Sequence, residues 1–102
     1  MKRSVEDRHR ELVDELEEKV KKNYTIIFRD VMVRNVFTGQ VVGEIDLAGM
    51  VDGNLDLYEV KVTDRPQKAR KQLLNLRRHL QNCGNVRLYY CCGKSGEIKE
   101  VA

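Results

Sequence analysis

An Asp52-Gly53 pair stands between two segments rich in β-branched and aliphatic residues, 41–51 and 55–62. Asp-Gly is a preferred pair for the two-residue turn that joins antiparallel strands, because both central residues of that turn need a positive φ. The pattern therefore predicts a hairpin whose two strands have these bounds. A chain of 102 residues has room for one small domain, so we expect a single domain over residues 1–102 with this hairpin at its centre.

The two-residue turn also fixes which side chains face each other. Counting back from it places Asp46 directly opposite Glu59, with Lys61 and Glu44 on the same face of the sheet. Like charges that oppose each other are destabilising unless a cation compensates them, and Mg²⁺ prefers one or two carboxylates plus water. The alternative is a solvated salt-bridge ladder in which Glu44 pairs with Lys61. The apolar residues around these charges favour the metal site, since carboxylates on a central strand need a partner.

Periodicity and turn residues predict the elements around the hairpin. Ser4 can cap an amphipathic helix, and Pro66 suits the first turn of a second helix with Thr63 or Asp64 as its cap. A strand that starts at Tyr24 is expected to bend near Arg29-Asp30 and to end at the Thr38-Gly39 turn. The predicted order is α-β-β-β-α-β-β, with elements over residues 4–22, 24–38, 41–51, 55–62, 66–82, 86–92 and 97–101.

The first helix carries a histidine where an apolar residue would be expected. Its apolar stripe follows helical spacing, and His9 falls at the middle of that stripe while Glu11 lies nearly opposite. A histidine there is either a satisfied core residue or a ligand that points into a site. The predicted stripe consists of Val5, His9, Leu12, Val13, Leu16 and Val20.

Three cysteines, Cys83, Cys91 and Cys92, fit a disulfide framework poorly because their number is odd, and no CxxC pair suggests a zinc site. We expect them to be small apolar packing residues. Cys91 and Cys92 are adjacent on a predicted strand and should therefore point to opposite faces of the sheet.

Charge is segregated along the chain, although the formal total is only +3. Residues 41–61 carry five acidic groups against one lysine, whereas residues 65–80 carry six basic groups and no acid. An acidic centre followed by a basic helix is what a metal site beside a phosphate-binding surface requires, although charge runs are usually solvated faces. The nucleic-acid contacts expected on this helix, to backbone rather than to bases, are Arg65, Lys68, Arg70, Lys71, Arg77 and Arg78.

No apolar run approaches the roughly 20 residues that a membrane-spanning helix needs, and the first residues do not form a signal-peptide core. We therefore expect no membrane partner and a cytoplasmic, nucleoid-associated protein.

The segment Gly43-Glu44-Ile45-Asp46, the hairpin and Glu59-Val60-Lys61 together resemble the PD-(D/E)XK nuclease superfamily over about residues 5–92. That resemblance implies a restriction-endonuclease-like three-layer α/β core, α-β-β-β-α-β, with a mixed central sheet. The segments 10–13 and 59–63 are most similar to archaeal Holliday junction resolvases, which carry Glu where this chain has His9. A helix-one His and a Gln at position 72 are instead similar to RecB-like nucleases, although Leu76 stands where those have an aromatic residue.

The resemblance implies a Mg²⁺- or Mn²⁺-dependent deoxyribonuclease. Asp46, Glu59, the Val60 carbonyl and His9 would hold the metal; Asp46, Glu59, Lys61 and Gln72 would be the catalytic residues. Within that set Lys61 would orient the attacking water, and Gln72 would position Lys61 or the phosphate unless it is a plain surface residue. Junctions, flaps and ends in DNA repair or recombination are the candidate substrates. The chain is short, so a homodimer or a larger nucleic-acid-processing complex is expected. The alternative is a non-catalytic nucleic-acid-binding or structural member of the same fold.

Overall fold

The Asp52-Gly53 turn forms as predicted, with φ values of 51° and 76°. It joins β2 (Val41–Val51) to β3 (Asn54–Lys61), which pair antiparallel from Val51↔Asn54 to Leu47↔Tyr58. The register near the turn is therefore the predicted one.

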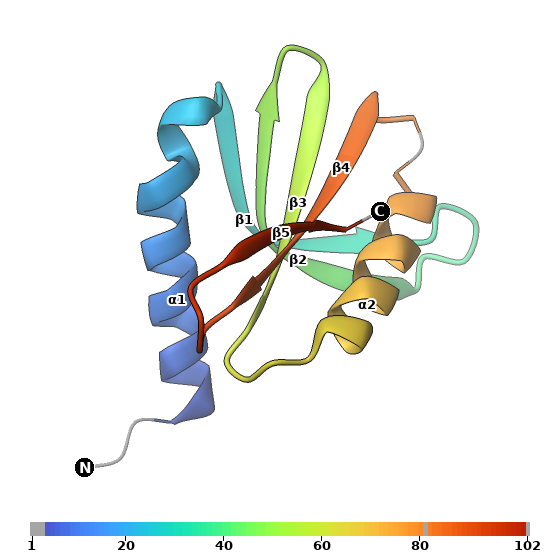
Figure 1. The fold of residues 1–102 in the computed structure, drawn as a ribbon. Coiled ribbons are helices and arrows are strands. Elements are labelled where there is room, and N and C mark those ends of the chain that lie inside the picture. Colours follow the sequence, from blue (N-terminus) through green and yellow to red (C-terminus); the bar gives the residue numbers. More distant parts are fainter. Residues whose placement is uncertain (1–3, 81, 102) are drawn as a thin grey trace.

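The computed structural model describes residues 4–80 and 82–101 and shows an α/β fold with one five-stranded mixed sheet and two α-helices (Figure 1). The strand order is β1-β2-β3-β4-β5, with β3 and β4 parallel and all other neighbours antiparallel. The predicted class, mixed sheet and element order are confirmed.

Neither helix in the described ranges is long and apolar enough to span a membrane. The remaining elements are α1 (Val5–Val20), a 3₁₀ turn (Lys21–Asn23), β1 (Ile26–Arg34), α2 (Pro66–Arg78), β4 (Asn85–Cys92) and β5 (Ile98–Val101).

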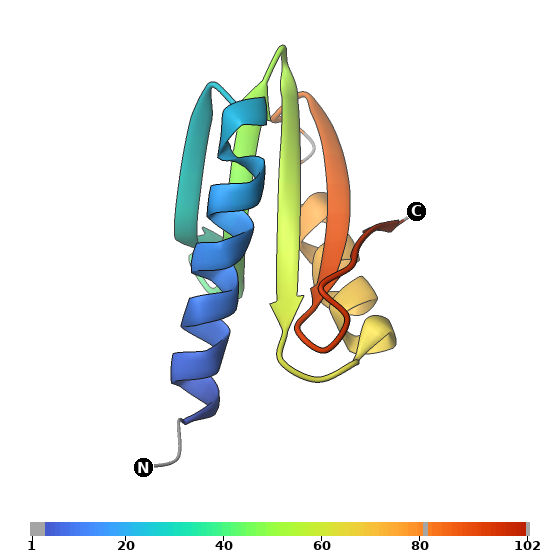
Figure 2. The same ribbon diagram turned by 60° about the vertical axis from the view of Figure 1, so that its left-hand side comes forward.

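The two helices pack against opposite faces of the sheet, as Figures 1 and 2 show. Leu12, Val13 and Leu16 of α1 form one buried cluster with Leu47 and Tyr58. A second cluster on the other face combines residues of α2 with aliphatic side chains from all of the first four strands. Its buried members are Val33, Ile45, Ala48, Leu55, Leu57, Leu73, Leu76 and Leu88.

Strands β1 and β2 turn away from the rest of the sheet halfway along their length (Figure 1). Asp30 has a φ of 53°, and it lies between the pairs Arg29↔Leu47 and Val31↔Ile45. On one side of this point Leu47 packs with α1, and on the other Ile45 packs with α2. The predicted bend near Arg29-Asp30 is therefore present, and it carries the far half of the β1–β2 hairpin towards α2.

Two predicted element ends are wrong. Strand β1 ends at Arg34, because the Asn35 side chain accepts hydrogen bonds from the N–H groups of Phe37 and Thr38 and starts a turn there. Helix α2 ends at Arg78 instead of reaching residue 82.

The structure also tests the predicted N-terminal caps of both helices and the predicted burial of Val5 on α1. Ser4 caps α1 by accepting from the Asp7 N–H at 3.1 Å, as expected. Neither Thr63 nor Asp64 caps α2; residue 65 holds that position without a side-chain cap, and Asp64 accepts from the Tyr90 hydroxyl instead. Val5 is 72% exposed and does not belong to the core, because it lies on the first turn of α1 beyond the sheet.

The adjacent cysteines lie on opposite faces, Cys91 in the α1 cluster and Cys92 beside Ala69 of α2, as predicted. Cys83 is exposed, so the prediction that it is a packing residue is wrong. All three thiols are free.

A buried polar cluster lies near the Asp52-Gly53 end of the sheet. Asp56 is 2% exposed and accepts two hydrogen bonds from Arg87, at 2.6 and 2.9 Å, and one from the Tyr24 hydroxyl. The Tyr24 hydroxyl also contacts that of Tyr58. The Tyr24 ring lies over Gly49, where an added Cβ would come within 2.4 Å of a ring carbon.

We expect Gly49→Ala to lower the free energy of unfolding by about 1–3 kcal/mol, because the new methyl group overlaps the Tyr24 ring. Urea denaturation measures this change. The same substitution in a Tyr24→Ala background should cost much less. Equal costs in the two backgrounds would show that the Tyr24 ring is not what Gly49 accommodates.

Candidate metal and active site

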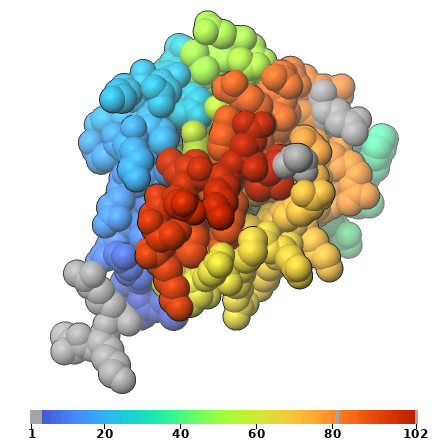
Figure 3. Space-filling view, in the orientation of Figure 1, coloured from blue at the N-terminus to red at the C-terminus, as the bar shows by residue number. Residues whose placement is uncertain are grey.

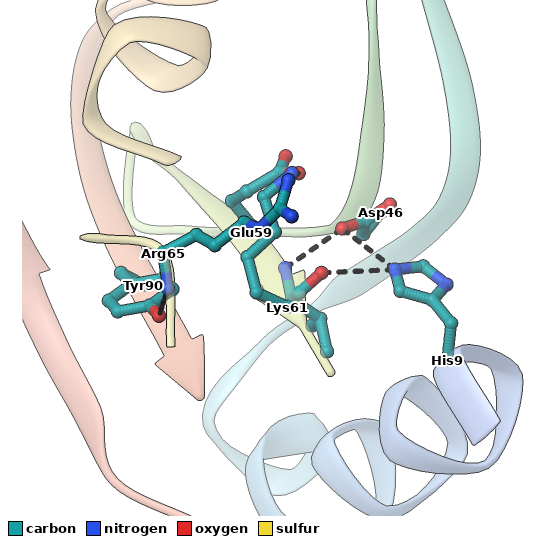
Figure 4. A network of polar contacts seen from close by, with 7 residues as sticks. His9, Asp46, Glu59, Lys61, Arg65 and Tyr90 are labelled. Carbon is teal, nitrogen blue, oxygen red and sulfur yellow. Dashed lines mark hydrogen bonds and ion pairs between the residues drawn. The ribbon is translucent and has the colours of Figure 1, made fainter. Parts of the chain in front are cut away.

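The centre of the candidate site is the main chain of Val60, where β2 has left β3. The antiparallel ladder ends at Leu47↔Tyr58, so Asp46 does not pair with Glu59, and that prediction is wrong. The Asp46 carboxylate instead accepts a hydrogen bond from the Val60 N–H at 2.8 Å. His9 Nε2 lies 3.1 Å from the Val60 carbonyl oxygen and 3.3 Å from the same Asp46 oxygen (Figure 4). Three of the four predicted metal-binding groups therefore converge.

The protonation of His9 follows from these neighbours. A carbonyl oxygen and a carboxylate oxygen only accept hydrogen bonds, so His9 Nε2 carries a hydrogen in this arrangement. A metal ligand must offer a lone pair instead. Metal binding through Nε2 therefore displaces that hydrogen.

Glu59 and Lys61 form an ion pair beside this convergence point, with 3.2 Å between Oε1 and Nζ. Glu59 is 6% exposed, and its burial, followed by the charge of Asp46, raises the pKa of its carboxyl to about 7 despite the opposing effects of Lys61 and His9. Lys61 pairs with Glu59 rather than with the exposed Glu44, so the predicted alternative of a Glu44–Lys61 ladder is not formed.

A cleft of about 950 Å³ holds these groups at one end of the molecule. Figure 3 shows the start of α1 (blue) and the loop between β3 and α2 (yellow) at that end. His9, Asp46, Glu59, Val60 and Lys61 all line the cleft, as does the exposed Gln72. The structure thus brings every predicted catalytic and metal-binding residue into one cleft.

Two arginines that line the cleft were missed from the sequence. Arg10 follows His9 on α1, and Arg29 reaches the cleft from the bend in β1. Arg29 is held by Asp14 at 2.6 Å, whereas Arg10 is exposed. The sequence signals for Arg10 are the neighbouring His9 and its place in the segment 10–13, which is similar to archaeal Holliday junction resolvases. The contribution of Arg29 depends on a bend whose direction the sequence does not specify.

The six basic residues predicted to bind nucleic acid do not form one surface. Arg65 lines the cleft. Arg77 and Arg78 line a separate pocket of about 540 Å³ at the other end of α2, with Asn85. Lys68, Arg70 and Lys71 are exposed between the two. A helix of 13 residues is about 20 Å long, so the two ends of α2 contact different parts of any ligand.

The donors at this site suit a hard divalent cation. Imidazole nitrogen, carboxylate oxygen and a backbone carbonyl converge, with a second, buried carboxyl beside them; oxygen-rich sets of this kind suit Mg²⁺ and Mn²⁺. In the part of the chain that the structure describes, no three or more His, Cys, Asp or Glu side chains form a group that could hold a metal. Two side chains and a carbonyl do converge, and Glu59 is turned towards Lys61.

No protein-family model matches the chain, and no curated protein gives a significant match.

We expect Asp46→Ala to lower the free energy of unfolding by about 1–3 kcal/mol, because the Val60 N–H loses its acceptor. Asp46→Asn keeps an oxygen there and should retain most of the stability. Both should be compared by urea denaturation at pH 5, where Glu59 is protonated. Equal losses in the two variants would contradict the assigned hydrogen bond.

The raised pKa of Glu59 predicts a loss of stability as the pH rises. The unfolded chain releases the Glu59 proton near 4.5 and the folded chain near 7, so the stabilisation present below pH 4.5 is lost through this window. Without metal, the parent should lose about 3 kcal/mol more than Glu59→Gln between pH 4.5 and 8. Denaturation curves in EDTA measure this difference. Parallel pH profiles for the two proteins would show that Glu59 ionises normally in the fold.

Proposed function

We propose that this protein is a Mg²⁺- or Mn²⁺-dependent deoxyribonuclease with a restriction-endonuclease-like three-layer core. The observation that supports this best is the convergence of His9, Asp46 and the Val60 carbonyl in one cleft with the Glu59–Lys61 pair. The helices on both faces and the α-β-β-β-α-β order agree with the core that the sequence resemblance implies.

Asp46, Glu59, His9 and the Val60 carbonyl would hold the metal. When bound, the ion would supply Lewis-acid chemistry, lowering the pKa of water and neutralising phosphate charge. The raised pKa of Glu59 supports this assignment, because a cation at this position favours the ionised carboxylate that burial and Asp46 disfavour.

Lys61 supplies the positive charge of the site. The Lys61 side chain is 17% exposed and its ammonium lies against Glu59, from where it can donate hydrogen bonds to an attacking water or to a phosphate oxygen. Gln72 lines the same cleft and can hydrogen-bond a phosphate oxygen. Arg10 and Arg65 add positive charge at its rim from α1 and from the start of α2. These residues contact phosphate and sugar, which gives affinity without base specificity.

The test is cleavage of labelled single-stranded, duplex, flapped and four-way-junction DNA with Mn²⁺. We expect EDTA to abolish cleavage and Lys61→Ala to reduce it by about 100-fold or more, since removal of one donor that stabilises developing charge costs this much. Lys22→Ala is the matched control, because it removes the same charge from an exposed position outside the cleft and away from α2.

Cleavage by Lys61→Ala at the parent rate would identify a contaminant as the nuclease. DNA that is shifted in EDTA but is never cut with Mn²⁺ would assign the chain to the non-catalytic binding proteins of this fold.

A further inference from the structure

A tight turn between β1 and β2 holds two apolar side chains in solvent. Phe37 is 94% exposed and Val36 is 86% exposed. Phe37 is the most exposed of the six aromatic residues, all of which the structure describes. Exposed apolar side chains that are adjacent on a protein surface are a feature of interaction sites.

The turn is fixed by its own hydrogen bonds. The Asn35 N–H donates to the Gln40 carbonyl and the Gly39 N–H donates to the Asn35 carbonyl, both at 2.8 Å. The Asn35 side chain accepts from the N–H groups of Phe37 and Thr38, and Arg34 donates to the Gly39 carbonyl at 2.9 Å. The backbone thus holds Phe37 with its side chain 94% exposed, and a partner would not have to order the loop.

Two arginines lie close to this turn, Arg34 at its start and Arg78 on α2. Residues 31–43 and 65–80 have no Asp or Glu. The turn is tied to α2, because Asn75 donates to the Val42 carbonyl and Arg78 donates to Asn75. In Figure 3 the segment coloured teal to green projects past α2 at the right-hand edge. The turn that exposes Phe37 therefore lies beside the Arg78 end of the basic helix α2.

We propose that Phe37 stacks on an unpaired base of DNA whose adjacent phosphates lie at the Arg78 end of α2. This inference rests on the proposed DNA-binding function and deepens it by naming the substrate class: DNA with single-stranded or unpaired nucleotides. A nucleic acid joins an aromatic surface to negative charge, which matches the ring and the acid-free helix. A second copy of this chain fits less well, because pairing through this turn would bring two cationic helices together.

The experiment measures binding in EDTA, where no cleavage occurs. Three fluorescein-labelled DNAs serve as probes: a single strand, a duplex, and the same duplex with one unpaired base. The proteins are the parent, Phe37→Ala, Phe37→Tyr and Val36→Ala, each checked by thermal unfolding. Phe37 makes no core contact, so these variants should unfold like the parent.

We expect Phe37→Ala to weaken binding to the single strand and to the bulged duplex by roughly five-fold or more, as loss of one base stack does. Binding to the full duplex should be unchanged, and Phe37→Tyr should restore parent affinity. Val36→Ala should have a smaller effect.

Equal affinities of the parent and Phe37→Ala for all three DNAs would overturn the inference while leaving the proposed function standing. If the parent binds none of them, the inference and the proposed function fall together. A dimer that Phe37→Ala dissociates, or anionic vesicles that only the parent binds, would overturn the inference if DNA affinity is unaffected. Sedimentation and vesicle co-pelleting measure these.

Discussion

The site depends on the point at which β2 separates from β3. A strand that loses its neighbour leaves N–H and C=O groups without partners, and such groups are costly when they are shielded from water. At Val60 the Asp46 carboxylate accepts from the N–H, and His9 contacts the carbonyl. The contacts that give the Val60 N–H and C=O groups hydrogen-bond partners therefore also bring together the Asp46 carboxylate, the Val60 carbonyl and His9 Nε2. The bend at Asp30 and Asp46 makes this possible by turning β1 and β2 towards α2.

Strand β3 carries two buried carboxyl groups, Asp56 and Glu59, in different surroundings. Asp56 belongs to a polar cluster that stabilises the fold, whereas Glu59 lies in the candidate site. Asp56 accepts hydrogen bonds from Arg87 and Tyr24 at the turn end of the strand. Glu59 lies three residues further along the strand and has Lys61 as its ion-pair partner, and burial and Asp46 raise the pKa of its carboxyl. A buried carboxyl whose pKa is raised by burial and by a second carboxylate is a typical feature of functional sites.

Much of this arrangement could be predicted from local pattern. The Asp52-Gly53 turn set the register, and alternation then placed Leu47 opposite Tyr58 as observed. Beyond that pair the register could not be extrapolated, because the positive φ of Asp30 and the rotation of β2 arise from packing against two helices. Sequence patterning identified His9 and Glu59 but not the contact of His9 with the Val60 carbonyl. It also could not show that Arg65 lines the cleft whereas Arg77 and Arg78 line a separate pocket, which depends on where that helix crosses the sheet.

We propose that the donors around Val60 bind a divalent cation, and a Mn²⁺ titration followed by electron paramagnetic resonance at pH 8 measures that binding. We expect one Mn²⁺ per chain in the parent protein, with binding lost or strongly weakened in Glu59→Gln and unchanged in Glu44→Gln, an exposed carboxylate at the rim of the same cleft. A parent protein that binds no Mn²⁺, or that binds it equally well in Glu59→Gln, would contradict it.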